Sequence, residues 1–159
     1  MDIRVGNGFD VHKFTTGNNL KLCGINIKFH QGLTGHSDAD VALHALTDAL
    51  LGAIGKGDIG IWFPPTDPKW KNADSSIFLK FANQEITKQD YRISNIDLTI
   101  ICEEPKINLY SKDMTKFLSK VLDLNIDRIN VKATTTEKLG FTGRKEGIAA
   151  QCIAVLLSK

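Results

Sequence analysis

The chain has 159 residues, of which 42% are hydrophobic and 24% are charged, and its formal net charge at pH 7 is +2. This size and composition are ordinary for one globular domain with a buried core, and the charge is too small to favour nucleic acid or a membrane surface as a partner. The sequence holds no apolar run of membrane-spanning length and no secretory signal at its start. We therefore expect a single domain over residues 1–159 that binds neither nucleic acid nor membrane.

The apolar periodicity predicts the elements in chain order. Alternation and β-forming residues predict strands at 3–11, 20–23, 25–29, 93–102, 129–133 and 147–157. Helical spacing predicts helices at 41–54, 75–89 and 110–122. Residues 30–37 are expected to form a loop, with Asp38 as the N-cap of the first helix and Asp40 in its first turn. This order predicts an α+β fold with helices on one face of a mixed four-stranded sheet.

An aromatic loop is expected between the first two helices. Glycine and proline punctuate residues 57–68, which carry Trp62 and Phe63, and Trp70 follows shortly after. The aromatic side chains of such a loop either pack on the core or line a pocket. The sequence leaves both readings open.

Asp10, His12 and His44 form a candidate metal site. Asp10 and His12 are two residues apart in a predicted strand, so their side chains face the same way, and His44 lies in the following helix. Two imidazoles and one carboxylate are a common set for catalytic zinc, with a fourth position left open. The alternative is that all three are ordinary polar residues of a strand end and a solvated helix face.

Two further readings concern Asp48 and the cysteines. Asp48 lies one helical turn after His44 and is either an acceptor for the second N–H of that imidazole or a solvated charge. Cys23, Cys102 and Cys152 are isolated and odd in number, which argues against a disulfide framework or a thiolate zinc site and fits a reducing compartment.

A second polar cluster lies between the last two predicted strands. Three consecutive threonines, 134–136, precede Glu137, and a glycine-flanked basic loop leads to Arg144. Hydroxyl and backbone N–H groups can bind phosphate, and a carboxylate can hold a hard cation between phosphates. The alternative is an ordinary loop with solvated charges. Neither the P-loop pattern nor the dinucleotide-binding glycine pattern is present.

Four motifs in this order resemble one enzyme family. Residues 8–12 (Gly-Phe-Asp-Val-His), 35–44, 57–60 (Gly-Asp-Ile-Gly) and 132–144 are similar to those of 2-C-methyl-D-erythritol 2,4-cyclodiphosphate synthases. The resemblance runs from about Ile3 to Leu157. It implies a lyase of the non-mevalonate route to isoprenoids. Such an enzyme converts 4-diphosphocytidyl-2-C-methyl-D-erythritol 2-phosphate into the 2,4-cyclodiphosphate and CMP.

The resemblance also implies roles for particular residues. Asp10, His12 and His44 would bind one zinc ion per chain, and Glu137 would bind a magnesium or manganese ion with the substrate. His36 and Thr135 would stabilise the transition state. The implied substrate-binding residues are Asp10, His12, His36, Ser37, Asp58, Ile59, Gly60, Phe63, Asp67, Cys102, Pro105, Lys106, Asn108, Thr134, Thr135, Thr136, Glu137, Phe141 and Arg144.

Two positions depart from the family pattern. Pro65 stands where the family often has an acid, so we expect any contact made by that side chain to be lost. The pair Glu103–Glu104 is more acidic than usual beside Pro105, which affects the expected contacts of the cytidine pocket.

The resemblance further implies a homotrimer with active sites between chains. The final strand, 147–157, is apolar on both faces, and such a strand needs cover on both. An isoprenoid diphosphate is an expected ligand of the trimer cavity, near Phe141 and Arg144. The expected location is the cytoplasm in a bacterium, or a plastid-type organelle if a transit peptide was removed.

Two rival functions use the same residues. A metal-dependent phosphohydrolase would activate water at the Asp10, His12 and His44 site, and a binding trimer would hold a nucleotide or isoprenoid without turnover. The presence of both predicted metal sites argues against a pure binder.

Overall fold

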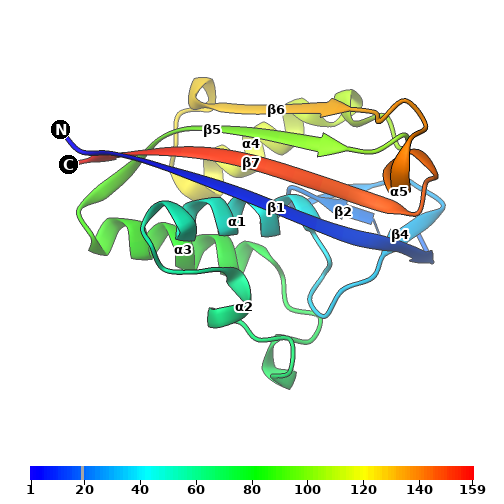
Figure 1. Ribbon diagram of the computed structural model, residues 1–159, viewed down its shortest axis with the longest axis horizontal. Helices are drawn as coiled ribbons and strands as arrows, with labels where there is room; N and C mark the ends of the chain where they lie inside the picture. Colours follow the sequence, from blue (N-terminus) through cyan, green and yellow to red (C-terminus); the bar gives the residue numbers. More distant parts are fainter. Residues whose placement is uncertain (19) are drawn as a thin grey trace.

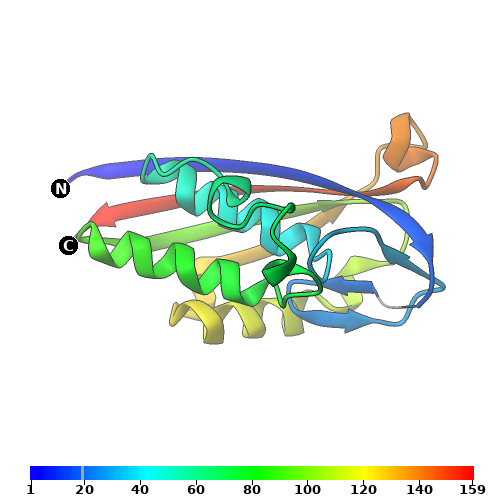
Figure 2. The ribbon, with the colours of Figure 1, turned by 90° about the horizontal axis from the view of Figure 1, so that it is seen from below.

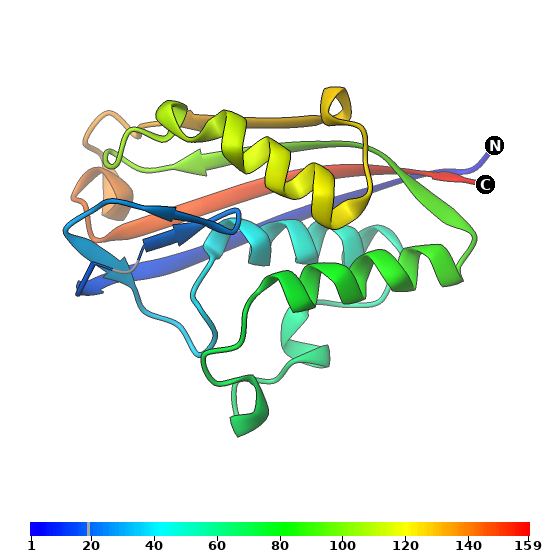
Figure 3. The same cartoon turned by 180° about the vertical axis from the view of Figure 1, so that it is seen from behind.

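A computed structural model describes residues 1–18 and 20–159 of the chain, and it has two layers. One layer is a five-stranded sheet of order β4-β1-β7-β5-β6, and the other consists of helices α1, α3 and α4 (Figures 1 and 3). The sheet strands are β1 (Ile3–Thr16), β4 (Gln31–Leu33), β5 (Tyr91–Ile101), β6 (Ile129–Thr134) and β7 (Gly147–Ser158). A separate hairpin joins β2 (Leu20–Leu22) and β3 (Ile25–Ile27).

The three long helices cover one face of the sheet, as the sequence predicts. They are α1 (Val41–Ala53), α3 (Ser76–Lys88) and α4 (Ser111–Leu122). Short turns fill the connections: α2 (Ile59–Trp62), α5 (Gly140–Gly143), η1 (Pro68–Trp70), η2 (Ile107–Leu109) and η3 (Ile126–Arg128). Within residues 1–18 and 20–159, no helix has the length and apolar character needed to cross a membrane.

The mixed α+β architecture is confirmed, but the predicted strand count of four is wrong. β5 and β6 are parallel and the other pairs are antiparallel. β1 continues past its predicted end to Thr16, and this extension pairs with Gln31–Leu33, which the sequence predicts as loop. Three residues are too few to give a clear alternating pattern, so the pairing depends on a distant partner rather than on local sequence.

α1 lies directly against β1, between the sheet and α3 (Figure 2). Two glycines of β1 permit this close approach. A Cβ added at Gly6 would lie 1.8 Å from the Ala49 carbonyl oxygen, and one added at Gly8 would lie 1.9 Å from that of Ala45. The contact brings one face of α1 onto the helix-facing side chains of β1, which include those of Asp10 and His12.

Among the described residues, no helix covers the opposite face of the sheet, which carries exposed apolar side chains together with polar ones such as Asn7 and Gln151. Its exposed apolar side chains, which we call the open sheet face, come from β1 and β7. They are Ile3, Val5, Phe9, Val11 and Ile153, with exposed fractions between 37% and 63%. Side chains on the helix-facing side of β7 are fully buried, so the two faces of this strand have different surroundings.

Candidate metal centre

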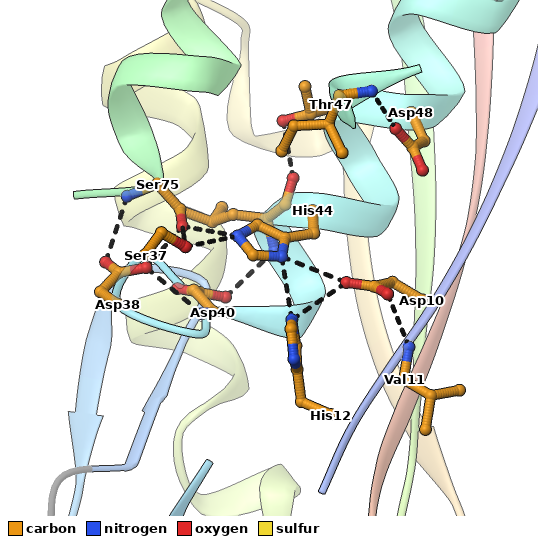
Figure 4. Close-up of polar contacts among 12 residues, drawn as sticks. Asp10, Val11, His12, Ser37, Asp38, Asp40, His44, Thr47, Asp48 and Ser75 are labelled. Atoms are coloured by element: carbon orange, nitrogen blue, oxygen red, sulfur yellow. Dashed lines mark hydrogen bonds and ion pairs between the residues drawn. The ribbon is translucent and has the colours of Figure 1, made fainter. Parts of the chain in front are cut away.

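Asp10 and His12 of β1 meet His44 of α1 at the predicted site (Figure 4). His12 Nε2 lies 3.0 Å from His44 Nδ1, and Asp10 Oδ2 lies 3.1 Å from each of these nitrogens. The three atoms therefore form a nearly equilateral triangle. Ligand atoms about 2.0–2.1 Å from a tetrahedral zinc ion lie about 3.3 Å apart. The triangle thus fits zinc with a small outward adjustment and leaves the fourth position open.

The orientation of His12 is fixed by a backbone carbonyl. Its Nδ1 lies 2.8 Å from the Thr34 carbonyl oxygen, which can only accept a hydrogen bond. Nδ1 therefore carries the proton, and Nε2 presents a lone pair to Asp10 and His44. This arrangement is typical of a metal-binding histidine.

The site also favours positive charge. Burial opposes ionisation of Asp10, but the close contacts of its carboxylate with the His12 and His44 imidazoles outweigh it and hold the pKa of Asp10 well below its usual range. Burial likewise opposes a charge on His12, while the hydrogen bond and charge of Asp10 raise the pKa of the imidazole overall. A carboxylate held ionised beside two imidazoles is suited to a metal cation.

The N-terminus of α1 is held by Asp40, which corrects the predicted cap at Asp38. Asp40 Oδ1 accepts a hydrogen bond from Leu43 N at 3.0 Å and another from Cys23 N at 2.9 Å, while Oδ2 accepts from Gly24 N at 2.7 Å. Asp40 is fully buried, and burial raises the pKa of its carboxyl to about 6. This carboxyl ties the start of α1 to the β2–β3 turn and so fixes the helix that carries His44.

Asp38 and Ser75 lie on the side of the His44 ring that faces away from Asp10 and His12 (Figure 4). His44 Nε2 lies 2.8 Å from Ser75 Oγ and 3.1 Å from Ser37 Oγ. Ser75 Oγ lies 2.5 Å from Asp38 Oδ1. Sequence reasoning missed this role of Ser75, because a serine just before a helix is ordinarily interpreted as an N-cap, whereas its side chain makes no capping bond to α3.

Asp48 fits neither of its predicted roles. Its Oδ1 accepts a hydrogen bond from Ile59 N at 2.8 Å, and burial raises the pKa of this half-buried carboxyl. It does not bind the second nitrogen of His44, which Ser75 contacts. Asp48 instead holds the start of α2, the predicted substrate segment.

A cavity of about 230 Å³ opens beside the three ligands. The predicted site residues that line it are Asp10, His12, His36, Ser37, His44, Ile59, Gly60 and Phe63. Pro65 and Trp70, which belong to the segment that the sequence predicts as an aromatic loop or its edge, line it as well, and so does Phe78, which sequence reasoning did not assign to the site. The rings of Phe63 and Trp70 are 4.9 Å apart, and Phe78 lies 4.4 Å from Phe63. The aromatic loop therefore packs together and lines a pocket at the same time.

Two predicted substrate residues act as caps beside this cavity. Asp58 Oδ1 accepts from Ile61 N at 3.1 Å and caps α2. Asp67 Oδ1 accepts from Lys69 N at 2.9 Å, and the Asp67 carbonyl oxygen lies 3.0 Å from His36 Nε2. Neither is among the residues lining the cavity.

A second cavity, of about 150 Å³, lies at the ends of β5 and β6. Its lining residues are Cys102, Glu103, Pro105, Lys106, Ile107, Asn108, Ala133, Thr134 and Thr135. These include the residues predicted for the cytidine end. The two cavities share no lining residue, so within the described residues of one chain Thr135 and His36 are not brought to the same site.

The loop after β6 is anchored by the acidic pair that departs from the family pattern. Glu103 Oε1 accepts from Lys138 N at 2.9 Å, and Glu104 lies 3.3 Å from Lys145 Nζ. Glu137 and Lys138 both have positive φ angles of 53° and 64°. Glu103 thus supports the tight turn that presents Glu137. Thr136 has a structural role here, since its Oγ1 donates to the Leu139 carbonyl oxygen at 2.7 Å.

Comparison with known proteins gives consistent matches over nearly the whole chain. A model of the YgbB family matches residues 3–157. The 2-C-methyl-D-erythritol 2,4-cyclodiphosphate synthase of Cereibacter sphaeroides is 55% identical over 157 residues, which cover 99% of both proteins. The bifunctional enzyme IspD/IspF of Bartonella bacilliformis is 59% identical over 156 residues, covering 98% of this chain and 39% of that protein.

Solved structures show the same fold. The bifunctional IspDF from Campylobacter jejuni matches with a TM-score of 0.96 and 47% identity, over 99% of this chain and 43% of that chain. A CDP complex of IspF from Plasmodium falciparum matches with a TM-score of 0.87 and 37% identity, over 99% of this chain and 97% of that chain.

Proposed function

The chain belongs to the YgbB family and has the function of a 2-C-methyl-D-erythritol 2,4-cyclodiphosphate synthase, and from this premise we propose that a zinc ion held by Asp10, His12 and His44 assists its reaction. The supporting observation is the triangle of ligand atoms, 3.0–3.1 Å apart, at the edge of the 230 Å³ cavity. Bound zinc would supply Lewis acidity to a phosphate oxygen.

The reaction is a cyclisation within one substrate molecule. An oxygen of the 2-phosphate attacks the β-phosphorus of the cytidine diphosphate group. The bond from the β-phosphorus to its bridging oxygen breaks, and CMP leaves with that oxygen. No external nucleophile is needed, so the chain has to position two anionic groups and compensate their charge.

We propose that the first cavity holds the methylerythritol part and its 2-phosphate. His36 and Ser37 line this cavity beside the zinc ligands, where an imidazole and a hydroxyl can donate to phosphate oxygens. Ile59, Gly60 and Phe63 also line this cavity and would supply further contacts to the substrate. Pro65 also lines the cavity and offers no side-chain hydrogen bond, so contacts of this segment to the hydroxyls depend on its backbone.

The second cavity is proposed to hold the cytidine end, and Glu137 would hold a magnesium or manganese ion that offsets the charge of the phosphates. Pro105, Lys106 and Thr134 line this cavity, and the Plasmodium falciparum relative was solved with CDP. Hard cations such as magnesium prefer one or two carboxylates together with substrate phosphates. The turn that carries Glu137 starts beside Thr135 of the same cavity.

The separation of the two cavities supports a homotrimer with active sites between chains. Each chain contributes a metal half and a cytidine half that share no lining residue. The open sheet face gathers five exposed apolar side chains around the polar pair Asn7 and Gln151, and protein association typically covers exposed apolar groups of this kind. Packing three such faces around a common axis would bury it, and neighbouring chains would complete each other's sites.

We extend the proposal to an isoprenoid diphosphate in the trimer cavity. Phe141 lines a pocket with Val11 of the open sheet face, which suits an apolar chain. Arg144 is exposed and pairs with Glu146 at 3.0 Å, and it offers a cation to a diphosphate.

Product identification separates this function from its two rivals. Purified protein is incubated with the cytidine-linked substrate, zinc and magnesium, and the products are analysed by mass spectrometry. A synthase yields equal amounts of cyclodiphosphate and CMP. Linear phosphate products would indicate the phosphohydrolase, and recovery of intact substrate would indicate a binding protein.

A further inference from the structure

We infer that Ser75 and Asp38, held by Lys21, form a hydrogen-bonded relay that fixes the tautomer and orientation in which His44 binds metal through Nδ1. The inference rests on the metal centre proposed above and assigns positioning residues to it. The chain of contacts runs from His44 Nε2 to Ser75 Oγ at 2.8 Å, then to Asp38 Oδ1 at 2.5 Å (Figure 4).

The direction of each hydrogen bond follows from the end of this chain. An ionised carboxylate can only accept, so the Ser75 hydroxyl donates its single hydrogen to Asp38. Ser75 Oγ then has only lone pairs to offer to His44, and it accepts from Nε2–H. The proton of neutral His44 is thereby assigned to Nε2, and its Nδ1 presents a lone pair to Asp10 and His12.

Asp38 is suited to be the fixed end of the relay. Lys21 Nζ lies 3.0 Å from Asp38 Oδ2, and Ser75 N donates to the same oxygen at 3.1 Å. The side chains of Asp38 and Lys21 are only 14% and 18% exposed. Burial opposes the charge of Lys21, but its hydrogen bonds to Asp38 and Asp74 raise the pKa of the ammonium overall. The two donors thus hold the Asp38 carboxylate in place beside Ser75.

The relay connects elements that are far apart in the sequence. Lys21 belongs to β2, Asp38 precedes α1, and Ser75 precedes α3, where its side chain is fully buried. Ser37 Oγ is a second neighbour of His44 Nε2, but it lies farther away, at 3.1 Å, and faces the substrate cavity. Ser75 is therefore the residue that holds the ring when substrate occupies Ser37.

As a consequence, Asp10, His12 and His44 each direct a lone pair toward the same point. The Thr34 carbonyl assigns the proton of His12 to Nδ1, and the relay assigns that of His44 to Nε2. The facing atoms of both rings and the Asp10 oxygen then all act as donors of lone pairs to the same point. His12 would bind the metal through Nε2 and His44 through Nδ1, because the Thr34 carbonyl and Ser75 occupy the other nitrogen of each ring.

The relay is tested by zinc affinity in the full-length protein, measured by competition with a chromophoric chelator. We expect Ser75→Ala to weaken zinc binding about ten-fold or more, because outer partners of metal-bound histidines typically contribute 10–100-fold. Thr47→Val is the matched control. Thr47 is a fully buried hydroxyl on α1 that donates to the Leu43 carbonyl oxygen and not to His44, so its removal should leave zinc affinity within two-fold.

A zinc affinity of Ser75→Ala equal to that of the Thr47→Val control would overturn the relay. If Ser75→Ala does not fold, Asp38→Asn gives the same test, because an amide in place of the carboxylate no longer forces the Ser75 hydroxyl to donate. Nitrogen-15 NMR of metal-free wild-type protein gives an independent readout, because no zinc ion then dictates which nitrogen of His44 carries the proton. A proton on His44 Nε2 agrees with the relay, and a proton on Nδ1 contradicts it. Absence of zinc binding in the wild type would instead overturn the metal centre itself.

Discussion

At the scale of single residues, the candidate metal ligands follow from the sequence, whereas the residues that support them do not. Asp10 and His12 share a face by strand periodicity, and His44 is placed by the family motif and the helix pattern. Ser75 contacts His44 across 31 positions of sequence, and no local pattern encodes such a contact. Local periodicity thus identifies ligands, whereas their outer partners depend on how helices and loops pack.

Asp48→Ala should separate substrate positioning from metal binding. The substitution removes the acceptor for Ile59 N and loosens the start of α2, which lines the proposed substrate cavity. A hydrogen bond to a charged group contributes about 1.5–3 kcal/mol, so kcat/KM should fall roughly ten-fold or more. Zinc affinity should match the wild type. A loss of zinc affinity comparable to that of Ser75→Ala would show that Asp48 supports the metal after all.

Glu137→Gln should remove the second cation and leave the first. Two unit charges about 4 Å apart in a partly desolvated site interact by about 4 kcal/mol, so the departing CMP needs a compensating cation. We expect zinc content to be unchanged and kcat to fall strongly, with turnover of the wild type depending on added magnesium or manganese. Undiminished turnover of zinc-loaded enzyme in magnesium-free buffer would exclude the second cation.

At the scale of elements, long periodic segments are predicted well and short paired ones are not. The helices at α1, α3 and α4 and the strands β5, β6 and β7 lie within two residues of their predicted bounds. β4 and the end of β1 are missed because their pairing is set by distant residues. The caps at Asp58 and Asp67 turn part of the predicted loop 57–68 into short helical turns.

The contact between β1 and α1 can be tested by substituting alanine for one glycine that lies in the contact and for another that lies outside it. A Cβ at Gly8 would lie 1.9 Å from the Ala45 carbonyl oxygen, which is rigid backbone, so Gly8→Ala must push α1 and His44 away from β1. We expect a loss of about 1–3 kcal/mol or more in the free energy of unfolding, together with weaker zinc binding.

Gly52→Ala is the matched control for this substitution. Gly52 is exposed on the same helix, and an added Cβ meets nothing within 4 Å. It should stabilise the protein by up to about 1 kcal/mol through its higher helix propensity. Denaturant unfolding and zinc titration measure both variants. Equal stability of Gly8→Ala and Gly52→Ala would mean that the close approach of α1 to β1 does not fix the position of His44.

At the scale of the whole molecule, the apolar residues on the two sides of β7 have different surroundings. Helices bury one side, and Ile153 on the other is 45% exposed in the single chain. The sequence predicts that β7 is apolar on both faces, but it does not say what covers the second face. The proposal that a second copy of the chain covers it rests on the separation of the two cavities.

Ile153→Lys should break the proposed trimer. Placing a charge within the open sheet face opposes burial, so we expect a monomer that retains zinc but loses turnover, because each chain then has only half of each site. Ile126→Lys is the control, since Ile126 is 46% exposed in η3, outside that face. Sedimentation velocity and activity are measured together. An active monomeric wild type would contradict shared sites.

Zinc titration of metal-free protein tests the central claim most directly. Zinc is added stepwise to apoenzyme with excess magnesium and substrate, and bound zinc and cyclodiphosphate formation are measured on the same samples. We expect activity to rise in proportion to bound zinc and to reach a plateau at one zinc per chain, while His44→Ala binds no zinc at this site and stays inactive. Full cyclodiphosphate formation by zinc-free enzyme, or by His44→Ala, would contradict the account.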